Sequence, residues 1–436
     1  MKKFLYSVFM LAAVVLAACS NDDNGDTQPK RGMILNASVE NLSSRATMTD
    51  ESGTWKFAFA ANDKVSVSNN KISNYYTFTN NGSQFTCAQA EATTENADWY
   101  AYFPGNEVDL KNQTGTFADV ANKFAVAGKT AQTTTGEKGL SITLKPKVAV
   151  LRVVAVDKKG ILDIHVKTTA DDKWVKGLTA TKNAADFTVS TSDTKTTLLH
   201  KAEGTVNAGE INYVVVPAGV KIEIYNGDLL LNKTKDAGLT AGKYYTITSG
   251  PTKGTETATL ANGTTETVEW VQLWAGGPRF ATKNVAEEMT WTDAAKTGKN
   301  YAWGEKWRTP TAAEVTEEGG LQAEWNTKEG KWVVKEGSPT INVTTKDGIE
   351  ETVEFTGVQP GYTKNTLTLY NKIDSHGYSH FNFWTTTENN GYGCMYRIMI
   401  DKGIIGIFGP SSFESKDTKC LVRPVLSIQN ITNNKK

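Results

Sequence analysis

The chain has 436 residues, and its 47 Lys and Arg residues balance 47 Asp and Glu residues, so its formal net charge is zero. A protein without a basic field does not gather phosphates, which argues against nucleic acid as a partner. Four Cys residues are too few to make a disulfide scaffold of this length, so packed cores must stabilise the chain. The 37 Gly residues, and the lack of long segments with 3.6-residue periodicity, predict a mainly β protein of several domains.

The first residues have the layout of a secretory signal. Lys2 and Lys3 form a basic start, and residues 4–18 are a mostly apolar run that ends in small side chains. This run is too short to span a bilayer, which takes roughly 20 residues. Cys19 follows Leu16-Ala17-Ala18, as in the signals of bacterial lipoproteins. We therefore expect residues 1–18 to be removed and Cys19 to carry acyl chains such as palmitate; the alternative is an ordinary secretory signal with a chance Cys.

Residues 19–32 are polar and acidic and have no apolar spacing, so they are predicted to form a flexible tether. Ser20 and the acidic run after it resemble the export signal of outer-surface lipoproteins in Bacteroidetes. The resemblance implies a lipoprotein that is exposed at the cell surface and held in the outer membrane by its lipid.

Two consecutive segments, residues 33–145 and residues 146–250, have the pattern of β domains built from short strands and turns. In the first, short strands alternate with turns, and the aromatic run from Trp99 to Phe103 stops at a Pro-Gly pair. In the second, residues 148–156 are almost continuously apolar, as expected of a strand buried on both faces. Asn226-Gly227 lies between two apolar stretches and predicts a tight hairpin turn.

This half of the chain carries seven short motifs in order: Ser44-Arg45-Ala46-Thr47, Gly53-Thr54-Trp55, Asn62-Asp63-Lys64-Val65, Trp99-Tyr100-Ala101-Tyr102-Phe103-Pro104, residues 147–153, Tyr213-Val214-Val215-Val216-Pro217 and residues 239–247. Together they are similar to the fimbrillin family of Bacteroidetes pilins. The resemblance implies two sandwich domains in tandem, with other pilus subunits as partners through donation of a β-strand. In some members of this family a protease cuts after a basic residue near the start of the first domain. Arg45, before Ala46, matches that position; the alternative is an ordinary exposed Arg in a loop, because tip and anchor subunits need not be cut.

The composition changes after residue 250. Residues 251–267 are rich in Gly and Thr and poor in large apolar side chains, so they are predicted to be a linker. Eight of the eleven Trp residues follow it, which predicts a different kind of domain over residues 268–430.

Five motifs occur in order in this last part: Tyr301-Ala302-Trp303-Gly304-Glu305, residues 307–314, Gln359-Pro360-Gly361-Tyr362, residues 383–388 and Val422-Arg423-Pro424-Val425. They resemble the major paralogous domain family named after Fibrobacter succinogenes, which is related to the C-type lectin-like fold. The resemblance implies an α+β domain. Thr311 and Glu314 have the spacing of a capping box, which predicts a short helix. The sequence has neither of the calcium triplets Glu-Pro-Asn and Trp-Asn-Asp, so calcium-dependent sugar binding is not supported.

Polar and aromatic residues in loops of this domain are the candidates for ligand binding. Aromatic faces beside amides and carboxylates suit a glycan or an exposed peptide of a host or bacterial surface protein, although turns have the same composition. The candidates are the loop region 362–378 with Tyr362 and Tyr378, and then Glu388, Asn389, Asn390 and Tyr392. We expect Trp303, Trp307 and Trp384 to be core aromatics instead.

The Cys and His residues give little indication of a disulfide, a metal site or a catalytic site. Cys394 and Cys420 could form a disulfide in an exported protein, or they could be two buried thiols. His376 and His380 have metal-ligand spacing, but Gly377 argues against the helix that would aim both rings at one ion. We therefore expect no catalytic residues, no metal and no cofactor, and the chain is not predicted to be an enzyme.

Two functions fit these observations. The first is a surface lipoprotein that serves as a fimbrial subunit, at a pilus tip or anchor, whose C-terminal domain acts in cell adhesion. The second is a stand-alone surface lipoprotein that binds glycans and uses the sandwich domains only as spacers.

Overall fold

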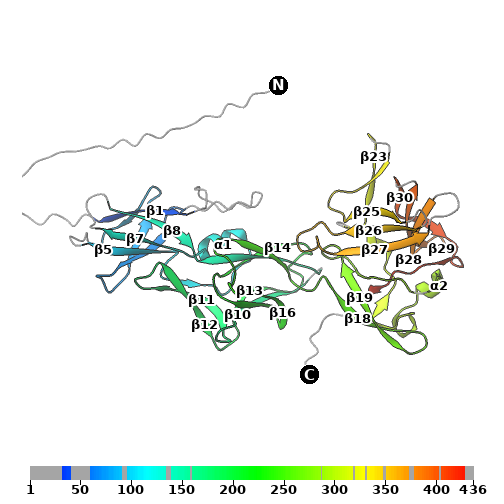
Figure 1. Ribbon diagram of the computed structural model, residues 1–436, viewed down its shortest axis with the longest axis horizontal. Helices are drawn as coiled ribbons and strands as arrows, with labels where there is room; N and C mark the ends of the chain where they lie inside the picture. The colour runs from blue at the N-terminus through cyan, green and yellow to red at the C-terminus, as the bar shows by residue number, and fades with distance from the viewer. Residues whose placement is uncertain are drawn as a thin grey trace, which may run out of the picture.

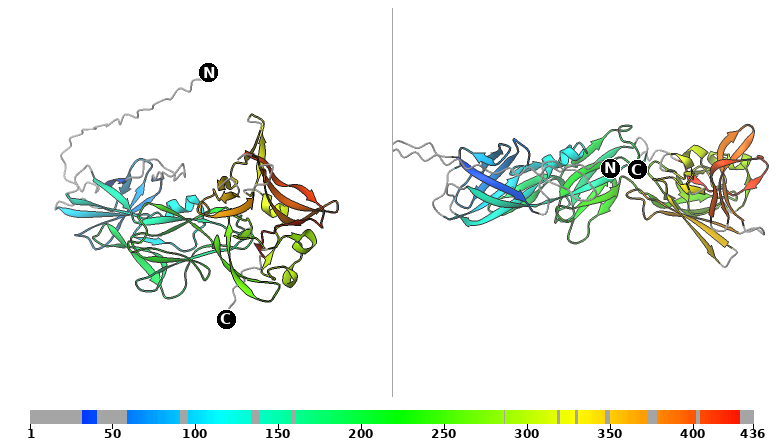
Figure 2. Two further views of the ribbon diagram at one scale, coloured as in Figure 1. Left: turned by 45° about the vertical axis from the view of Figure 1, so that its right-hand side comes forward. Right: turned by 90° about the horizontal axis from the view of Figure 1, so that it is seen from above.

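The structure is a computed structural model, which describes residues 32–40, 59–90, 96–133, 139–157, 160–285, 287–317, 320–328, 331–346, 350–372, 378–401 and 404–427. The protein is elongated and mainly β, with three units in a row (Figures 1 and 2). The first unit, which contains β1, lies at one end, and the C-terminal unit lies at the other.

The first unit is a closed barrel and not the β-sandwich that we predicted. Its seven strands are β1 (Met33–Val39), β2 (Lys64–Asn69), β3 (Tyr76–Asn80), β4 (Phe85–Cys87), β5 (Ala97–Phe103), β7 (Val126–Thr133) and β8 (Leu140–Pro146). The sheet order is β1-β4-β3-β2-β5-β7-β8, and parallel pairing of β1 with β8 closes the ring. A sandwich needs two sheets with separate edges, whereas this pairing joins the two edges of a single sheet.

The middle unit is a sandwich of two sheets. One sheet has the order β12-β11-β10-β15-β16, with β13 added on β10 and β6 on β11, and the other has the order β14-β9-β17. The strands are β6 (Glu107–Asp109), β9 (Val148–Val154), β10 (Leu162–Thr168), β11 (Trp174–Thr181), β12 (Asp186–Ser192), β13 (Thr197–Lys201), β14 (Ile211–Pro217), β15 (Ile222–Asn226), β16 (Leu229–Lys233) and β17 (Tyr244–Thr248).

Two predictions for the middle unit can be compared directly with the structure. Every residue of β9 except Arg152 is buried, as expected for the long apolar run. The hairpin of β15 and β16 also forms, but Asn226 pairs with Leu229, so the turn residues are Gly227 and Asp228. Gly227 has φ +59° in the first turn position, which is where a type II′ turn requires glycine.

The barrel and the sandwich are not separated at residue 145. β6 pairs with β11 of the sandwich, and the helix α1 (Phe117–Lys123) lies against β14, although both elements precede residue 145. A single cluster of buried apolar side chains runs through both units. The two units therefore share one core.

The predicted linker is wrong, because its residues form a β-hairpin of the C-terminal unit. β18 (Lys253–Thr259) pairs with β19 (Thr265–Gln272) along its whole length. Large apolar residues are few because the side chains of β18 are exposed or half-buried, except that of Ala258. Backbone pairing and β-branched Thr residues are enough to form this strand without buried apolar side chains. A pattern of apolar residues in the sequence therefore does not reveal it.

The C-terminal unit completes a sheet in the order β18-β19-β20-β32-β22 and adds smaller sheets and short helices. Its remaining elements are β20 (Arg279–Ala281), β21 (Met289–Thr290), α2 (Trp291–Ala294), the 3-10 helix η1 (Gly298–Asn300), β22 (Trp307–Arg308), α3 (Ala312–Thr316), β23 (Ala323–Asn326), β24 (Lys331–Val334), β25 (Thr340–Lys346), β26 (Glu350–Thr356), β27 (Thr366–Lys372), β28 (Tyr378–Asn389), β29 (Tyr392–Asp401), β30 (Ile404–Glu414), β31 (Lys419–Cys420) and β32 (Val425–Leu426).

Local predictions in this unit hold where they rest on capping or on burial. The capping box of Thr311 and Glu314 starts α3, with hydrogen bonds in both directions. Trp303, Trp307 and Trp384 are core residues, at most 3% exposed. Residues 362–378, expected to be a long loop, instead contain β27. Among the described residues, no helix combines the length and the apolar character needed to cross a membrane.

Candidate functional site

β1 is the strand that closes the barrel. It pairs antiparallel with β4, where Leu35 lies opposite Phe85, and parallel with β8, where Leu35 lies opposite Leu140 and Val39 opposite Leu144. Without β1, one strand position would be vacant between β4 and β8. We call this position the β1 slot.

The side chains of β1 alternate between the core and the solvent, as those of a strand with one buried face must. Met33 and Leu35 are buried in the shared core, and Ala37 and Val39 pack against it. Asn36, on the other face, is exposed. The inward residues of β8 lie beside those of β1, so both strands contribute to one apolar layer.

Two local features hold the ends of β1. Beyond its last residue, the backbone N–H of Glu40 donates to the oxygen of Leu144 at 2.8 Å, and the Glu40 carboxylate lies 2.9 Å from Nζ of Lys145. Before β8, Gly139 has φ +72°, and a Cβ there would lie 2.4 Å from the carbonyl oxygen of Ile34. Only glycine permits this close approach of the two backbones.

Arg45 and Ala46 lie outside the described residues, as does Cys19. The described chain resumes at Phe59, whose ring packs edge-on against Phe85 at 4.9 Å and against Phe103 at 5.2 Å. β1 thus ends at Val39, on the N-terminal side of the predicted cleavage position. Lipidation at Cys19 and cleavage at Arg45 both stay predictions.

The predicted ligand residues between 388 and 392 form a hairpin tip at the end of the molecule opposite the barrel (Figure 1). Asn389 lies opposite Tyr392, and Cys394 lies opposite Phe413 on the next strand. Alternation along β29 places Tyr392 on the same face as Cys394 and Phe413. Tyr392 is 52% exposed and Phe413 is 48% exposed. We call Asn389, Tyr392 and Phe413 the distal face.

The opposite face of this hairpin is occupied by a Trp ring and an ion pair. A Cβ on Gly393 would lie 2.4 Å from Cδ1 of Trp291, so the indole covers the strand closely. Nζ of Lys416 lies 4.7 Å from the centre of the same ring and 2.8 Å from the Glu388 carboxylate. Glu388 is therefore separated from the distal face, and Asn390 is an exposed turn residue with φ +50°.

Tyr362 is not a surface residue, contrary to our prediction. It is fully buried where the middle and C-terminal units meet, in a cluster with Val154, Val156 and Ala275. Burial raises the pKa of its phenol, and Asp157 adds to this. The residue packs the joint between two units and cannot reach a surface ligand. Tyr378 begins β28, but its side chain lies outside the described part of the structure.

Cys394 and Cys420 are free thiols in the structure, and both are buried. Cys420 packs in one apolar cluster together with Met395. Because neighbours on a strand point to opposite faces, Cys394 points away from the face that Met395 shares with Cys420. The structure thus has the arrangement of the second alternative, two buried thiols, and a bridge between them stays a prediction.

Charged residues of the C-terminal motifs have structural partners. Arg308 forms a two-point ion pair with Glu314, whose carboxylate also accepts from the Thr311 backbone. Although burial raises the pKa of Glu314, the Arg308 and Thr311 hydrogen bonds outweigh it and hold that pKa below its ordinary value. Arg423 donates to the carbonyl oxygens of Ala281 and Thr368.

Within the described ranges, no group of three His, Cys, Asp or Glu residues could hold a metal ion. His165 and His200 both contact the Asp163 carboxylate, in a network that belongs to the middle sandwich. His376 and the side chain of His380 lie outside the described part.

Sequence reasoning missed Phe413, which completes the distal face. The residue stands among Ser and Gly residues near the end of a strand, and only the pairing of Cys394 with Phe413 brings it close to Tyr392. The strand β1 was also not recognised as the closing element, because its parallel partner lies about a hundred residues later in the chain.

No family model matches the chain, and no curated protein matches it. Solved structures do resemble it. A candidate cell adhesion protein of Bacteroides uniformis ATCC 8492 is 14% identical, with a TM-score of 0.31, over 55% of this chain and 97% of its own. A fimbrial protein of Bacteroides ovatus ATCC 8483 is 11% identical, with a TM-score of 0.25, over 91% and 99%. The fimbrial anchor protein Mfa2 of Porphyromonas gingivalis is 7% identical, with a TM-score of 0.27, over 56% and 98%. The chain is thus similar to cell adhesion and fimbrial proteins of Bacteroidetes.

Proposed function

We propose that this chain is a cell-surface lipoprotein that serves as a fimbrial subunit, at the tip or the anchor of a fibre. Its joint with the next subunit would be the β1 slot, and the distal face would carry adhesion. The observation that supports this proposal is the place of β1: it closes the barrel, and it precedes Arg45 in the chain. Cleavage after Arg45 would cut the only covalent link between β1 and the rest of the barrel.

An empty β1 slot would need a replacement strand. The edges of β4 and β8 would lose their backbone partners, and the apolar residues Phe85, Leu140 and Leu144 would lose their cover. An extended segment of another subunit with alternating apolar side chains would restore both. Backbone hydrogen bonds supply affinity in this mode of binding, and alternate side chains supply specificity.

The uncut chain supports the second candidate function. With β1 in place the barrel has no free edge at this position, so the chain would be complete without a partner. Tyr392 and Phe413 remain exposed at the far end in either case. A stand-alone glycan-binding lipoprotein would use the barrel and the sandwich to hold this face away from the membrane.

Mass spectrometry of the mature surface protein separates these functions. An N-terminus at Ala46 supports strand exchange, and an acylated N-terminus at Cys19 supports an uncut anchor, tip or spacer. Arg45→Ala should abolish cleavage, while Arg31→Ala, which alters another basic residue before β1, should not. Purified protein that neither joins nor caps fibres of pilins from the same cell would refute a fimbrial role.

A further inference from the structure

Asparagine followed by glycine is a chemically reactive pair in a protein chain. The backbone nitrogen of the glycine can attack the side-chain amide carbon of the asparagine, and no Cβ on the glycine hinders the approach. The sequence contains five such pairs, and four of them lie among the described residues. These four are Asn81-Gly82, Asn226-Gly227, Asn262-Gly263 and Asn390-Gly391.

The backbone at the four pairs is similar, so hydrogen bonding decides which of them can react. Each of the four glycines has a positive φ, between +59° and +100°. For the reaction, the asparagine side chain must rotate toward the next backbone nitrogen, and that nitrogen must lose its proton. A hydrogen bond to the asparagine side chain opposes the rotation, and a hydrogen bond from the glycine N–H holds the proton in place.

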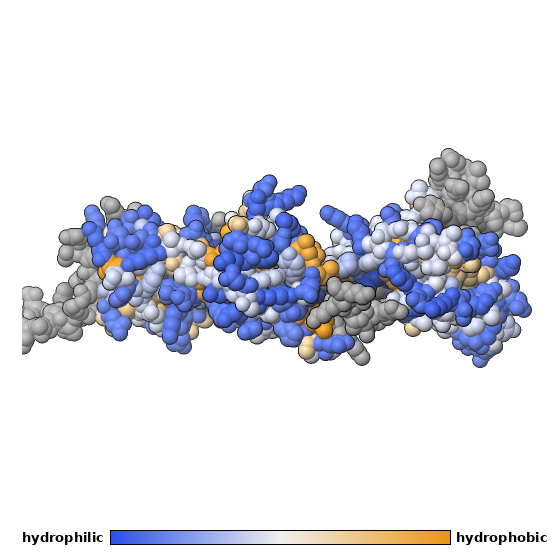
Figure 3. Space-filling model, turned by 90° about the horizontal axis from the view of Figure 1, so that it is seen from below, coloured by the Kyte–Doolittle hydropathy of each residue, from blue (hydrophilic) through white to orange (hydrophobic). Residues whose placement is uncertain are grey.

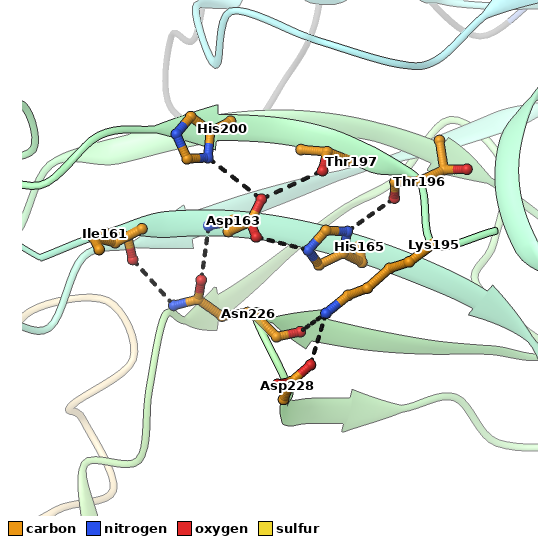
Figure 4. Close-up of polar contacts among 10 residues, drawn as sticks. Ile161, Asp163, His165, Lys195, Thr196, Thr197, His200, Asn226 and Asp228 are labelled. Atoms are coloured by element: carbon orange, nitrogen blue, oxygen red, sulfur yellow. Dashed lines mark hydrogen bonds and ion pairs between the residues drawn. The ribbon is translucent and has the colours of Figure 1, made fainter. Parts of the chain in front are cut away.

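Asn226-Gly227 is held by a network in the middle sandwich (Figure 4). Oδ1 of Asn226 accepts from the backbone N–H of Asp163 at 2.8 Å. Nδ2 of Asn226 donates to the carbonyl oxygen of Ser249 at 2.8 Å and to that of Ile161 at 3.3 Å. The N–H of Gly227 donates to the oxygen of Asp163 at 2.8 Å. Both reacting groups of this pair are therefore engaged in hydrogen bonds.

Asn81-Gly82 is exposed, but local contacts restrain it. Oδ1 of Asn81 accepts from the backbone N–H groups of Ser83 and Gln84, each at 3.1 Å. The N–H of Gly82 donates to Oδ1 of Asn80 at 3.0 Å. Exposure to solvent thus leaves both reacting groups of this pair hydrogen-bonded within the protein.

Asn262-Gly263, in the turn between β18 and β19, is restrained in the same way. Oδ1 of Asn262 accepts from the backbone N–H of Thr264 at 3.0 Å and from its hydroxyl at 2.7 Å. The N–H of Gly263 donates to the oxygen of Leu260 at 2.9 Å. This pair therefore also has to break hydrogen bonds on both reacting groups before it can react.

Asn390-Gly391 differs from the other three pairs. Both residues are exposed at the hairpin tip between β28 and β29, where Asn389 pairs with Tyr392. Among the described residues, no hydrogen bond engages the side chain of Asn390 or the N–H of Gly391. Hydrophilic colours prevail over this end of the molecule in Figure 3, as expected of a surface that water reaches. The amide carbon and the attacking nitrogen are thus both unrestrained at this pair.

We propose that Asn390 is a site at which the folded chain modifies itself by deamidation. The nitrogen of Gly391 bonds to Cγ of Asn390 as its own proton leaves, and the side-chain nitrogen departs as ammonia. The result is a cyclic imide, the succinimide. Water then adds to one of the two carbonyl carbons of this ring and breaks its bond to nitrogen. The products are aspartate and isoaspartate, each with a carboxylate in place of the neutral amide.

The hairpin tip can hold either product. Asn390 has φ +50°, a backbone region that aspartate also occupies. Isoaspartate lengthens the backbone, which an exposed two-residue turn can accommodate. The new charge would lie close to Tyr392 of the distal face, so an effect on adhesion rests on the proposed function. The reaction itself does not, because water is its only other reactant.

Peptide mapping of the incubated full chain by mass spectrometry tests this site, with the other three pairs as internal controls. Asn390 should deamidate at least about tenfold faster than Asn81, Asn226 or Asn262, because hydrogen bonds on both reacting groups must break at those pairs. In guanidinium chloride, which removes the fold, the four rates should become similar. Equal rates in the folded chain would overturn the proposal, and so would a difference that persists in the denaturant.

Two further measurements test the route through the succinimide. Gly391→Ala adds a Cβ that hinders the attack but meets no other atom within 4 Å, so it should slow the reaction at Asn390 severalfold and leave Asn262 unchanged. Unchanged hydrogen exchange of β29 would verify that the hairpin is intact. The rate at Asn390 should also rise with pH, because the nitrogen of Gly391 attacks only after losing its proton. A rate that neither Gly391→Ala nor pH alters would overturn the proposal.

Discussion

Replacing Leu35 by Ala tests the geometry of the β1 slot. Leu35 is fully buried and lies between Phe85 of β4 and Leu140 of β8. Truncation of a buried leucine to alanine leaves a cavity and costs roughly 2–5 kcal/mol, so we expect the free energy of unfolding to fall by about 3 kcal/mol. Ile34→Ala is the matched control, because Ile34 is half-buried on the outer face of the same strand. It should cost roughly 1 kcal/mol.

A chain with several domains does not unfold in a single two-state transition, so one global free energy of unfolding would not isolate the barrel. Native-state hydrogen exchange measures the stability of each unit separately. Amides of β5, on the far side of the barrel from β1, exchange only when the barrel opens. A loss of about 3 kcal/mol should speed up their exchange by roughly 100-fold in Leu35→Ala. A larger effect of Ile34→Ala than of Leu35→Ala would refute the register, since a slip by one residue exchanges the two faces of a strand.

Three further predictions concern the C-terminal unit. Thr311→Ala removes the cap of α3 and should lower the free energy of unfolding of this unit by about 1 kcal/mol, measured by exchange of its amides; no change would show that the cap contributes nothing. Because the pKa of Glu314 is held below its ordinary value of 4.5, the stability it provides is present above that pH and is lost as the pH falls through the lowered pKa. Thermal melts of Glu314→Gln should therefore depend less on pH in this acidic range than those of the wild type. Burial raises the pKa of Cys420 to about 12 and also raises that of Cys394, so neither thiol should react with iodoacetamide at pH 8 until the protein unfolds. As a control, the exposed cysteine introduced by Asn390→Cys should react at once. A peptide in which Cys394 and Cys420 are bridged, found by non-reducing peptide mapping, would contradict the prediction that both are free thiols.

The features that could be predicted from sequence are those in which a local pattern has one physical explanation. A short apolar run rich in β-branched residues, with a single Arg, indicates a buried strand, and β9 is one. Thr311 and Glu314 lie three residues apart, which is the spacing that a capping box requires, and α3 begins there. Even so, the hairpin turn was misplaced by one residue, since Asn226-Gly227 and Gly227-Asp228 both offer a glycine to the turn.

The features that were missed depend on contacts between distant parts of the chain. Closure of the barrel depends on β1 and β8, which are far apart in sequence, and no local pattern encodes a parallel pair of this kind. Tyr362 has the composition of a loop around it, but it is buried because the middle unit packs against it. β18 lacks the apolar alternation of a half-buried strand, because all its side chains except that of Ala258 are exposed or half-buried.

In the proposed function, the order of features along the chain would couple anchoring to assembly. Cys19, the proposed lipid anchor, and β1 both precede Arg45. In a cut protein, β1 would stay with the lipid, and only its two ladders and its buried side chains would hold the rest of the chain at the membrane. An incoming strand that displaced β1 would then release the chain into a fibre, whereas an uncut chain would stay anchored and closed.

This coupling predicts how the protein is shed from cells. Leu35→Ala weakens the hold of β1, so more of the cut protein should appear in the culture medium than for Ile34→Ala. Quantitative blotting of the cell and medium fractions measures the ratio. Adding Arg45→Ala should abolish the difference, because the covalent link then holds the chain regardless of how well β1 packs. Equal shedding of the Leu35 variant with and without Arg45 would mean that β1 is not the element that ties the barrel to the membrane.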